Sequence, residues 1–537
     1  MTTGIHTQRE WTATAAVGRK WALARRFGEF NPLHFLLLLS LALGGTTLLA
    51  TVLVHGVDRI EFEVYLLLLV LYAAATVSFL LSQGRSGRLR FFDIPVFTTI
   101  VCFLRFGLVP LAAYLDADSL NQSFHHGEYA QLNRSLAYFI LGMFTFWTGC
   151  HLSRRRKARI TDAREGVKGT PELRPVNWAV ILFLASLATR AYITWNYGYG
   201  YALDMDAYFQ NLAFFQFWAF FSDLGVYALL LATIEMCCHP RDALRVGLFV
   251  VIFLNELLWG ALSGMKYDLL RGFIILALVV SITKARIEKK WIAATLLGLI
   301  VVYPVHDRYR NMLRGGQVDV RRVGSLGEAG AMATAQTAKT EAGWSGWLRS
   351  GWQHAVSRLD LLQGMAIVMS LDAAQADRVR TDERWWMLPF YPFVPRLLWP
   401  KKPVLNSGVR LSLVLGSTKE TSTALTYPGD LYMDYGLPGI LVGMFVLAVV
   451  GQLLTNTVTG SFPKRSLFFY SAIFVSFANM METQAFPVWT GVIKTMVIFG
   501  VLKYLIYGRG PRTVGKRVRQ GGAASAMPKG APSPSAT

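Results

Sequence analysis

The chain has 537 residues, of which 53% are hydrophobic and only 16% are charged, and its mean hydropathy is positive. This composition argues against an ordinary soluble domain and is typical of a membrane protein. The formal net charge of +21 would suit a nucleic-acid-binding protein, but the placement of the basic residues along the chain argues against that function.

About twelve apolar runs, each about 17 to 22 residues long, predict transmembrane helices, because such a length crosses the hydrocarbon core of a bilayer. The predicted spans are 33–55, 62–82, 97–115, 135–152, 176–195, 212–236, 246–263, 268–284, 291–305, 437–457, 466–482 and 486–507. A membrane β-barrel would show short alternating segments instead. The predicted fold class is therefore an all-α polytopic membrane protein, in which the first run is a retained helix and not a signal peptide.

Basic residues gather in alternate connections between the predicted helices, as in "RRRKAR" (Arg154–Arg159), whereas the intervening short connections are nearly neutral or acidic. This is the positive-inside pattern, and it predicts that both termini are cytoplasmic. The basic connections then need no role beyond orientation and contact with anionic lipid, so no nucleic acid is expected as a partner.

The predicted spans divide the chain into four parts. Residues 1–305 form an N-terminal membrane bundle, 306–436 a large extracytoplasmic loop, 437–508 the last three membrane helices, and 509–537 a disordered basic tail. Within the loop, 344–374 is amphipathic and rich in tryptophan, which predicts an interfacial helix. A further segment, 384–403, is aromatic and rich in proline, so it cannot be one continuous helix.

Five charged residues fall within or at the end of predicted spans, where charge is costly and is either functional or paired. These residues are Arg105, Arg190, Asp223, Glu256 and Lys266. An arginine paired with Asp223 or Glu256 would fix helix packing. Lys266, at the outer end of its predicted helix, faces the same side as the large loop.

The large loop also supplies cations, among which Arg358, Arg396, Lys402 and Arg410 are the candidates for function. The planar guanidinium group matches phosphate oxygens, so a basic, tryptophan-rich loop at a membrane surface suggests an anionic lipid headgroup such as a pyrophosphate. Ordinary phospholipid headgroups are the alternative ligands. No metal-binding pattern, P-loop or dinucleotide fingerprint is present, so neither a metal nor a cofactor is expected.

The stretches "VPRLLWPKKPVLNSGVRL" and "TSTALTYPGDLYMDYGLPGILVGMFVLAVVGQLL" resemble the bacterial oligosaccharide repeat-unit polymerases, the Wzy-like or O-antigen polymerase family. The matching residues are Pro395, Arg396, Trp399, Pro400, Lys402, Pro403, Thr421, Ser422, Gly429, Asp430, Tyr432, Tyr435, Gly436 and Gly439. Two upstream stretches are similar as well, "SRLDLLQGM" with Arg358 and Asp360, and "SGMKYDLL" with Lys266. The resemblance covers about 355–450, and Asp430 departs from it because the family has glutamate there.

The resemblance implies a metal-independent glycosyltransferase of the bacterial inner membrane that polymerises undecaprenyl-pyrophosphate-linked oligosaccharides into a surface polysaccharide. Such an enzyme works among membrane lipids, and a chain-length regulator and a flippase are the protein partners to consider. In this chain the leaving pyrophosphate would be held by the cations Arg396, Lys402 and Arg410, as fixed charges can do.

The same resemblance implies roles for carboxylates and aromatic rings. Asp430, or alternatively Asp360, would orient or deprotonate the acceptor hydroxyl. The residues expected to bind substrate are Arg358, Asp360, Lys266, Trp399 and Tyr432.

Three alternatives stay open. Another polyprenyl-phosphate-dependent glycosyltransferase would use a carboxylate of the first outer connection, such as Asp58. An O-antigen ligase would use the same donor and a different acceptor. A transporter or flippase of the lipid-linked oligosaccharide would need charges along a path through the helices, for which Arg105, Arg190, Asp223 and Glu256 are available.

Overall fold

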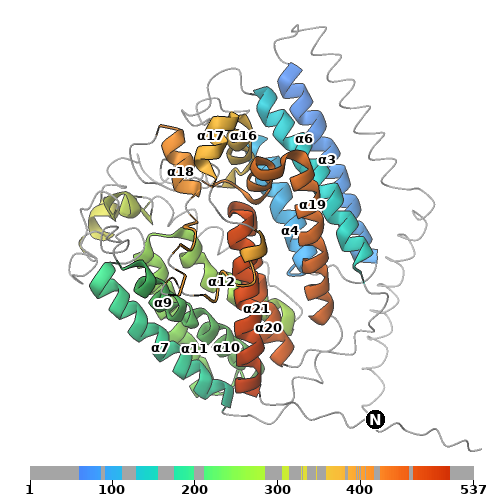
Figure 1. Ribbon diagram of the computed structural model, residues 1–537. Coiled ribbons are helices and arrows are strands. Elements are labelled where there is room, and N and C mark those ends of the chain that lie inside the picture. Colours follow the sequence, from blue (N-terminus) through green and yellow to red (C-terminus); the bar gives the residue numbers. More distant parts are fainter. Residues whose placement is uncertain are drawn as a thin grey trace, which may run out of the picture.

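A computed structural model of the chain is helical throughout the residues that it describes and contains no strand among them (Figure 1). The described residues are 60–85, 91–111, 129–154, 174–198, 211–284, 305–306, 308–313, 328, 330–335, 346, 359–380, 385–394, 396, 398–399, 401–405, 407–416, 424–458 and 464–507. The predicted all-α class is confirmed for this part of the chain.

Eight of the described helical spans are long and apolar enough to cross a membrane, and each coincides with a predicted span. They are α3 (Ile60–Arg85), α4 with the π-helix η2 (Ile94–Phe103, Leu104–Leu108), α6 (Tyr129–Leu152), α7 (Arg174–Tyr197), α9 with α10 (Leu212–Ser222, Leu224–Cys238), α11 (Ala243–Ser263), α19 (Tyr427–Val458) and α21 (Ala485–Tyr507).

Two further predicted spans are helices of 19 and 15 residues, α12 (Lys266–Lys284) and α20 (Lys464–Ala478). The predicted spans 33–55 and 291–305 lie outside the described residues, as does the predicted tail, 509–537. The chain is therefore a helical protein of membrane-spanning character, in which eight of the twelve predicted spans meet the criterion of length and composition.

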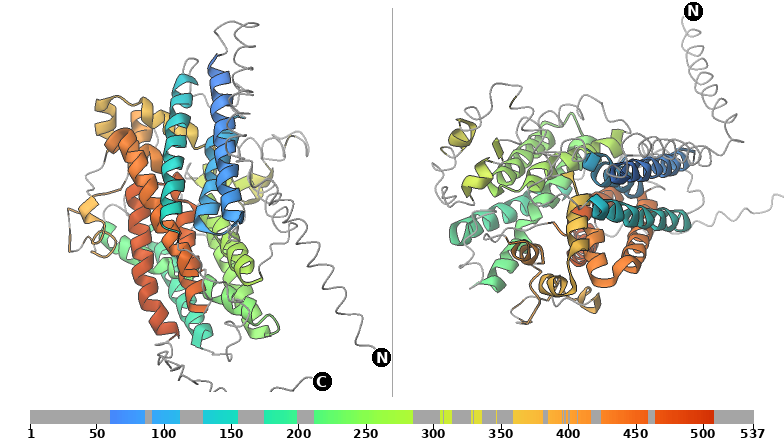
Figure 2. Two further views of the ribbon diagram at one scale, coloured as in Figure 1. Left: turned by 90° about the vertical axis from the view of Figure 1, so that its right-hand side faces the viewer. Right: turned by 90° about the horizontal axis from the view of Figure 1, so that it is seen from above.

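The helices form two bundles, each around its own apolar core (Figures 1 and 2). The first bundle contains α3, α4, α6 and α19, and the second contains α7, α10, α11 and α12 with α9 packed on α7. Side chains of α20 and α21 belong to both cores, so these two helices join the bundles. We call the end at which α6, α12, α19 and α21 begin the loop end.

Close packing within the first bundle depends on small residues of α6. A β-carbon added to Gly149 would stand 2.9 Å from both the Ala448 β-carbon and the Phe445 carbonyl oxygen of α19. Small residues let membrane helices approach closely. Dispersion contacts then hold the helices together, because no hydrophobic effect drives helix association within hydrocarbon.

Short helices of the predicted loop cover the loop end: α16 (Leu362–Ser370), α17 (Ala373–Val379), the 3₁₀ turn η5 (Trp385–Met387) and α18 (Ser407–Val414) (Figure 1). Most of the first half of the predicted interfacial helix over 344–374, residues 344–345 and 347–358, lies outside the described residues. Its described part is divided at Leu371, which has extended backbone dihedrals, and Asp372 then caps α17. The described part of the aromatic segment 384–403 consists of turns, so the prediction that it is not one continuous helix is confirmed.

Two helical spans differ from a straight helix: the predicted span 212–236, and α19, which begins at Tyr427, before the predicted span 437–457. The run 212–236 is interrupted at Asp223, where α9 ends and α10 begins. Within α19, Gly436 has a φ of 64° and a ψ of −155°, and Pro438 follows. The Tyr427 hydroxyl donates to the Gly443 carbonyl over 3.2 Å, so the segment before Gly436 folds back along the segment after it.

We predict that Gly149→Ala lowers the midpoint of thermal unfolding in detergent, because the added methyl group overpacks the contact with α19, at a cost of about 1–3 kcal/mol. The matched control is Gly247→Ala in α11, where no atom stands within 4 Å of the added β-carbon. Alanine is a better helix former than glycine, so the control keeps or raises the midpoint. Equal shifts of both variants would contradict the close α6–α19 contact.

Candidate functional site

The aromatic segment of the loop rests on the first turn of α21. The rings of Trp385 and Tyr391 lie edge-on to Phe486, with centroid distances of 6.1 and 5.2 Å. The Tyr391 hydroxyl donates to the Pro403 carbonyl over 2.9 Å, which closes the segment into a compact turn. Trp399 packs edge-on against Tyr391 at 6.4 Å. Aromatic and proline residues thus fix this part of the loop to the bundle without a regular helix.

This turn holds two of the predicted cations through main-chain carbonyl groups. Arg396 donates to the Pro403 carbonyl over 2.7 Å, and the Lys402 ammonium donates to the Val394 carbonyl over 3.0 Å. The ammonium also lies 4.4 Å from the centroid of the Tyr391 ring, a cation–π distance. Burial, followed by the neighbouring Arg396 charge, lowers the pKa of Lys402 to about 8.

The predicted loop cations have no carboxylate partner among the described residues. Arg396, Lys402 and Arg410 take part in no ion pair there, and Arg410 donates to the Arg380 carbonyl. The Nε atom of Arg396 is buried and has no hydrogen-bond partner. Buried donors are nearly always satisfied in proteins, so this guanidinium donor is available to an anion. The Nε atoms of Arg190 and Arg245 in the second bundle are also buried without a hydrogen bond, so this feature is not specific to the turn.

Six cations of the bundles differ, because each of them is paired with a carboxylate. The pairs are Arg105–Glu482 (3.0 Å), Arg190–Glu256 (2.6 Å), Arg245–Glu235 (3.3 Å), Arg271–Glu256 (3.5 Å), Arg271–Asp268 (3.5 Å), Lys464–Glu235 (2.9 Å) and Lys494–Asp223 (2.9 Å). The expectation that an arginine pairs with Glu256 is confirmed, and the pair is bidentate. Charge within the bundles is therefore neutralised internally.

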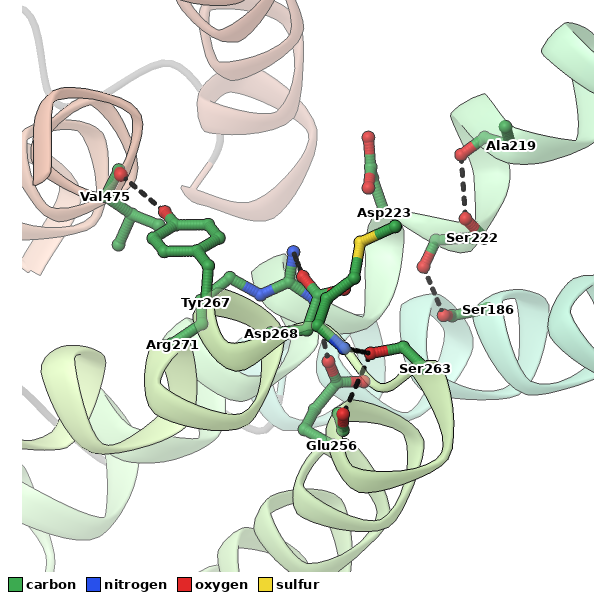
Figure 3. A network of polar contacts seen from close by, with 12 residues as sticks. Ser186, Ala219, Ser222, Asp223, Glu256, Ser263, Tyr267, Asp268, Arg271 and Val475 are labelled. Carbon is green, nitrogen blue, oxygen red and sulfur yellow. Dashed lines mark hydrogen bonds and ion pairs between the residues drawn. The ribbon is translucent and has the colours of Figure 1, made fainter. Parts of the chain in front are cut away.

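Of this set, only Arg105, Arg190, Asp223 and Glu256 were singled out from the sequence. The other seven members were missed, among them Asp268, Arg271 and Lys494. Figure 3 shows Arg271 and Asp268 of α12 near Glu256 of α11, with Asp223 above them. Arg271 and Asp268 are three residues apart and lie on one face of α12, which is a sequence signal for pairing. Lys494 sits alone in an apolar run, so only the fold reveals its partner.

Asp430 is buried where α19 meets the start of α21. Its carboxylate accepts a hydrogen bond from the Ala485 N–H over 2.8 Å, and Ala485 is the first residue of α21. A carboxylate at this position satisfies an otherwise unpaired amide and complements the helix dipole. The structure therefore gives Asp430 a capping contact that the motif alone did not predict.

Asp360 lies beside the pair formed by Arg105 and Glu482. Arg105 donates to the Leu359 carbonyl over 3.2 Å, and Asp360 accepts a hydrogen bond from the Gln363 N–H over 3.1 Å. Burial raises the pKa of Asp360 to about 6, against the opposing effects of these amide contacts and of Arg105.

The remaining predicted residues lie apart from this turn. Tyr432 packs on Tyr138 at a centroid distance of 6.0 Å, and Arg134 lies 3.5 Å from the Tyr432 hydroxyl. Arg410 reaches the start of α19 indirectly through Arg380, which pairs with Asp434 at 3.5 Å. Arg358 and Asp58 lie outside the described residues, and nothing of the Lys266 side chain is described.

Taken together, the described site residues surround the starts of α19 and α21. The aromatic turn places Arg396, Lys402 and Trp399 on α21, while Asp430 joins α19 to the same helix. Among the described residues, no group of three or more His, Cys, Asp or Glu residues could hold a metal ion. Fixed cations with unused donors can bind an anion and stabilise negative charge on a leaving group.

This fold and site define a polytopic helical protein with a cationic, aromatic turn packed on the start of α21. Comparison with family models gives a match over residues 199–506 to the family described as Domain of unknown function (DUF8712), and the chain belongs to this family. The matched region runs from before α9 to the end of α21, and so includes the turn and most of the paired network. No curated protein and no solved structure matches the chain.

We predict that Asp430→Ala lowers the thermal unfolding midpoint, because the buried Ala485 N–H loses its acceptor, at a cost of about 1–3 kcal/mol. Asp430→Asn retains a side-chain oxygen and keeps a midpoint close to that of the unmodified protein. An equal loss of stability in both variants would show that the charge matters and not the hydrogen bond.

We also predict a pH-dependent effect of Asp360→Asn. The pKa of this carboxyl is about 6 in the folded protein against an ordinary 3.8, so the folded state binds more protons between these values. Its contribution to stability is therefore full below about pH 4 and is lost as the pH rises through about 6. We expect the unfolding midpoint of Asp360→Asn, relative to that of the unmodified protein, to be higher at pH 7 than at pH 4. A difference that does not change with pH would contradict the raised pKa.

Proposed function

We propose that the chain is a glycosyltransferase that joins undecaprenyl-pyrophosphate-linked oligosaccharide repeat units into a surface polysaccharide. It acts at the outer face of the bacterial inner membrane, with twelve spans and both termini in the cytoplasm. The motif resemblance over about 355–450 supports this function, and so does the cationic, aromatic turn that the same residues build.

The observation that carries the proposal is the difference between paired and unpaired cations. Six cations within the bundles have carboxylate partners: Arg105, Arg190, Arg245, Arg271, Lys464 and Lys494. Arg396 and Lys402, in contrast, are held only by carbonyl oxygens and an aromatic ring. A lysine ammonium has three donors and an arginine has five, so both residues retain donors for a ligand. A lipid pyrophosphate supplies the missing charge and the missing acceptors.

The chemical step transfers the growing glycan from its carrier to the incoming repeat unit. A hydroxyl oxygen of the acceptor forms a bond to the anomeric carbon of the donor, and the bond from that carbon to the pyrophosphate oxygen breaks. The electron pair of the broken bond stays on the pyrophosphate, where Arg396 and Lys402 stabilise it. The proton of the acceptor hydroxyl passes to a carboxylate.

Of the two carboxylates proposed from the sequence, Asp360 is better suited to accept this proton. Asp430 is 5% exposed, and its carboxylate accepts from the Ala485 amide. Asp360 is half-buried, and its pKa of about 6 lies close to the working pH, where a general base is most effective. We therefore assign proton transfer to Asp360 and the positioning of α21 to Asp430.

The transport alternative finds less support. Arg105 is paired with Glu482, whereas Arg190 and Glu256 are paired in the other bundle. These charges neutralise one another and fix helix packing. This agrees with the interpretation of the sequence in which charges within spans are paired. A ligase would use the same donor with a different acceptor, and another glycosyltransferase would take its sugar from a polyprenyl phosphate. The pattern of products separates these activities from polymerisation.

The test uses purified protein with the host's own undecaprenyl-pyrophosphate-linked repeat unit, without nucleotide sugar or metal, and reads the products on a gel. The proposal predicts a ladder spaced by one repeat unit. Arg396→Ala and Lys402→Ala should each reduce the rate by about 10²–10³-fold, as removal of one fixed charge-stabilising group does. The matched control is Lys401→Ala, which removes an exposed charge from the same turn and should keep the rate.

Two results would contradict the proposal. No ladder from the unmodified protein, together with movement of the lipid across a vesicle membrane, would indicate a transporter. A ladder that is unchanged in Arg396→Ala and Lys402→Ala would exclude the turn as the site of the leaving group.

A further inference from the structure

Arg105 holds the segment that carries Asp360 at two points. Its Nε atom donates to the Leu359 carbonyl over 3.2 Å, and its own carbonyl accepts from the Leu361 N–H over 3.2 Å. Asp360 stands between these two anchored residues. A single residue of the first bundle therefore fixes the backbone on both sides of the carboxylate to which we assign proton transfer.

The sequence explains why the Arg105 carbonyl reaches outside its own helix. In a π-helix each carbonyl accepts from the N–H five residues later, and the Leu104 carbonyl of η2 accepts from Val109 in this way. The residue five positions after Arg105 is Pro110, which has no N–H to donate. The Arg105 carbonyl therefore makes no π-helical hydrogen bond and accepts from Leu361 instead. Single π-helical turns are frequent at functional sites.

The guanidinium of Arg105 also contacts Glu482, in the connection before α21. The Nη2 atom of Arg105 lies 3.0 Å from a Glu482 carboxylate oxygen, and the two side chains are 10% and 18% exposed. Three residues later, Ala485 begins α21 and donates its N–H to Asp430. Arg105 therefore ties the segment of Asp360 to the start of the helix on which the cationic turn rests.

Glu482 determines how strongly Arg105 acts on Asp360. A guanidinium that pairs directly with a carboxylate lowers the pKa of that carboxylate, which weakens it as a base. Arg105 pairs with Glu482 and not with Asp360. Burial raises the pKa of Asp360 to about 6, and Arg105 is the one charged side chain among the described residues that opposes this rise, as the weakest of the causes.

We propose that Arg105 is a positioning residue for the proton transfer, and that Glu482 keeps its guanidinium from pairing with the Asp360 carboxylate. Arg105 fixes where Asp360 stands relative to α21, whereas Glu482 balances the charge of Arg105. Both residues act through Asp360. This inference rests on the proposed function, because it concerns the group that receives the proton of the acceptor hydroxyl.

The test is the pH dependence of the polymerisation rate of the full-length protein, read from ladders of the host's lipid-linked repeat unit between about pH 5 and pH 9. The rate falls at low pH as the base becomes protonated. Arg105→Gln removes the positive charge, so the fall should move to higher pH. Glu482→Gln leaves the charge of Arg105 unbalanced, so the fall should move to lower pH. We expect each shift to be about half a pH unit or more.

Arg105→Lys separates the position of Asp360 from the charge beside it. Lysine keeps the charge but lacks the planar fork of arginine. The fall at low pH should therefore stay in place, while the rate drops by about 10–10²-fold across the whole pH range, because Asp360 is misplaced. The matched control is Lys464→Gln, which removes a paired cation at the end of the bundles opposite the loop end. It should keep both the rate and the pH profile.

The outcomes distinguish this inference from the proposed function. A fall at low pH that is unmoved in Arg105→Gln and Glu482→Gln, or that moves in one direction in both, would overturn the inference and leave polymerisation standing. If the unfolding midpoint shows that Arg105→Gln is not folded, Glu482→Gln decides alone, because glutamine still accepts the hydrogen bond from Arg105. No ladder from the unmodified protein at any pH would refute polymerisation and the inference with it.

Discussion

The cost of a charge within an apolar bundle is the constraint on which the rest of this structure depends. A buried ion is tolerated when a partner and hydrogen bonds replace its water. The embedded arginines and lysines therefore hold the bundles together: Arg105 joins η2 to the connection before α21, and Lys464 joins α20 to α10. On the aromatic turn, in contrast, Arg396 and Lys402 have no carboxylate partner among the described residues and are held by carbonyl groups.

The same constraint explains why the turn is built from aromatic and proline residues. A mobile loop would hold its cations in solvent, where fixed charges stabilise a leaving group poorly. Packing of Trp385 and Tyr391 on Phe486 anchors the turn to α21. Carbonyl groups then hold Arg396 and Lys402 without neutralising them.

Much of the fold could be predicted from the sequence, because apolar runs of membrane length leave the backbone few alternatives to a helix. The reversal within α19 also had a local signal, a glycine at positive φ followed by Pro438. The break between α9 and α10 at Asp223 had no sequence signal of comparable strength, because apolar residues continue on both sides of it. The partnership of Asp223 with Lys494 joins residues 271 positions apart, and only the packing of α10 against α21 could reveal it.

The residues that form the candidate site could largely be predicted from the sequence, whereas the role of each residue could not. The pattern around 393–411 indicated Arg396 and Lys402 because cations among aromatic residues and prolines are unusual beside membrane helices. Asp430 was placed with them as a carboxylate of the same motif, yet its oxygen meets the Ala485 amide. Motif spacing does not reveal whether a carboxylate meets solvent or a helix terminus, because that depends on how two distant helices pack.

The central claim is that the aromatic turn binds the pyrophosphate of a lipid carrier through cations that have no carboxylate partner. Native mass spectrometry of the purified protein with added undecaprenyl pyrophosphate, in the absence of any glycan, tests it most directly. The account predicts a bound lipid that is lost in the double variant Arg396→Ala, Lys402→Ala and retained in Lys464→Gln, which removes a paired bundle cation. Equal occupancy in all three proteins, or loss only in Lys464→Gln, would contradict it.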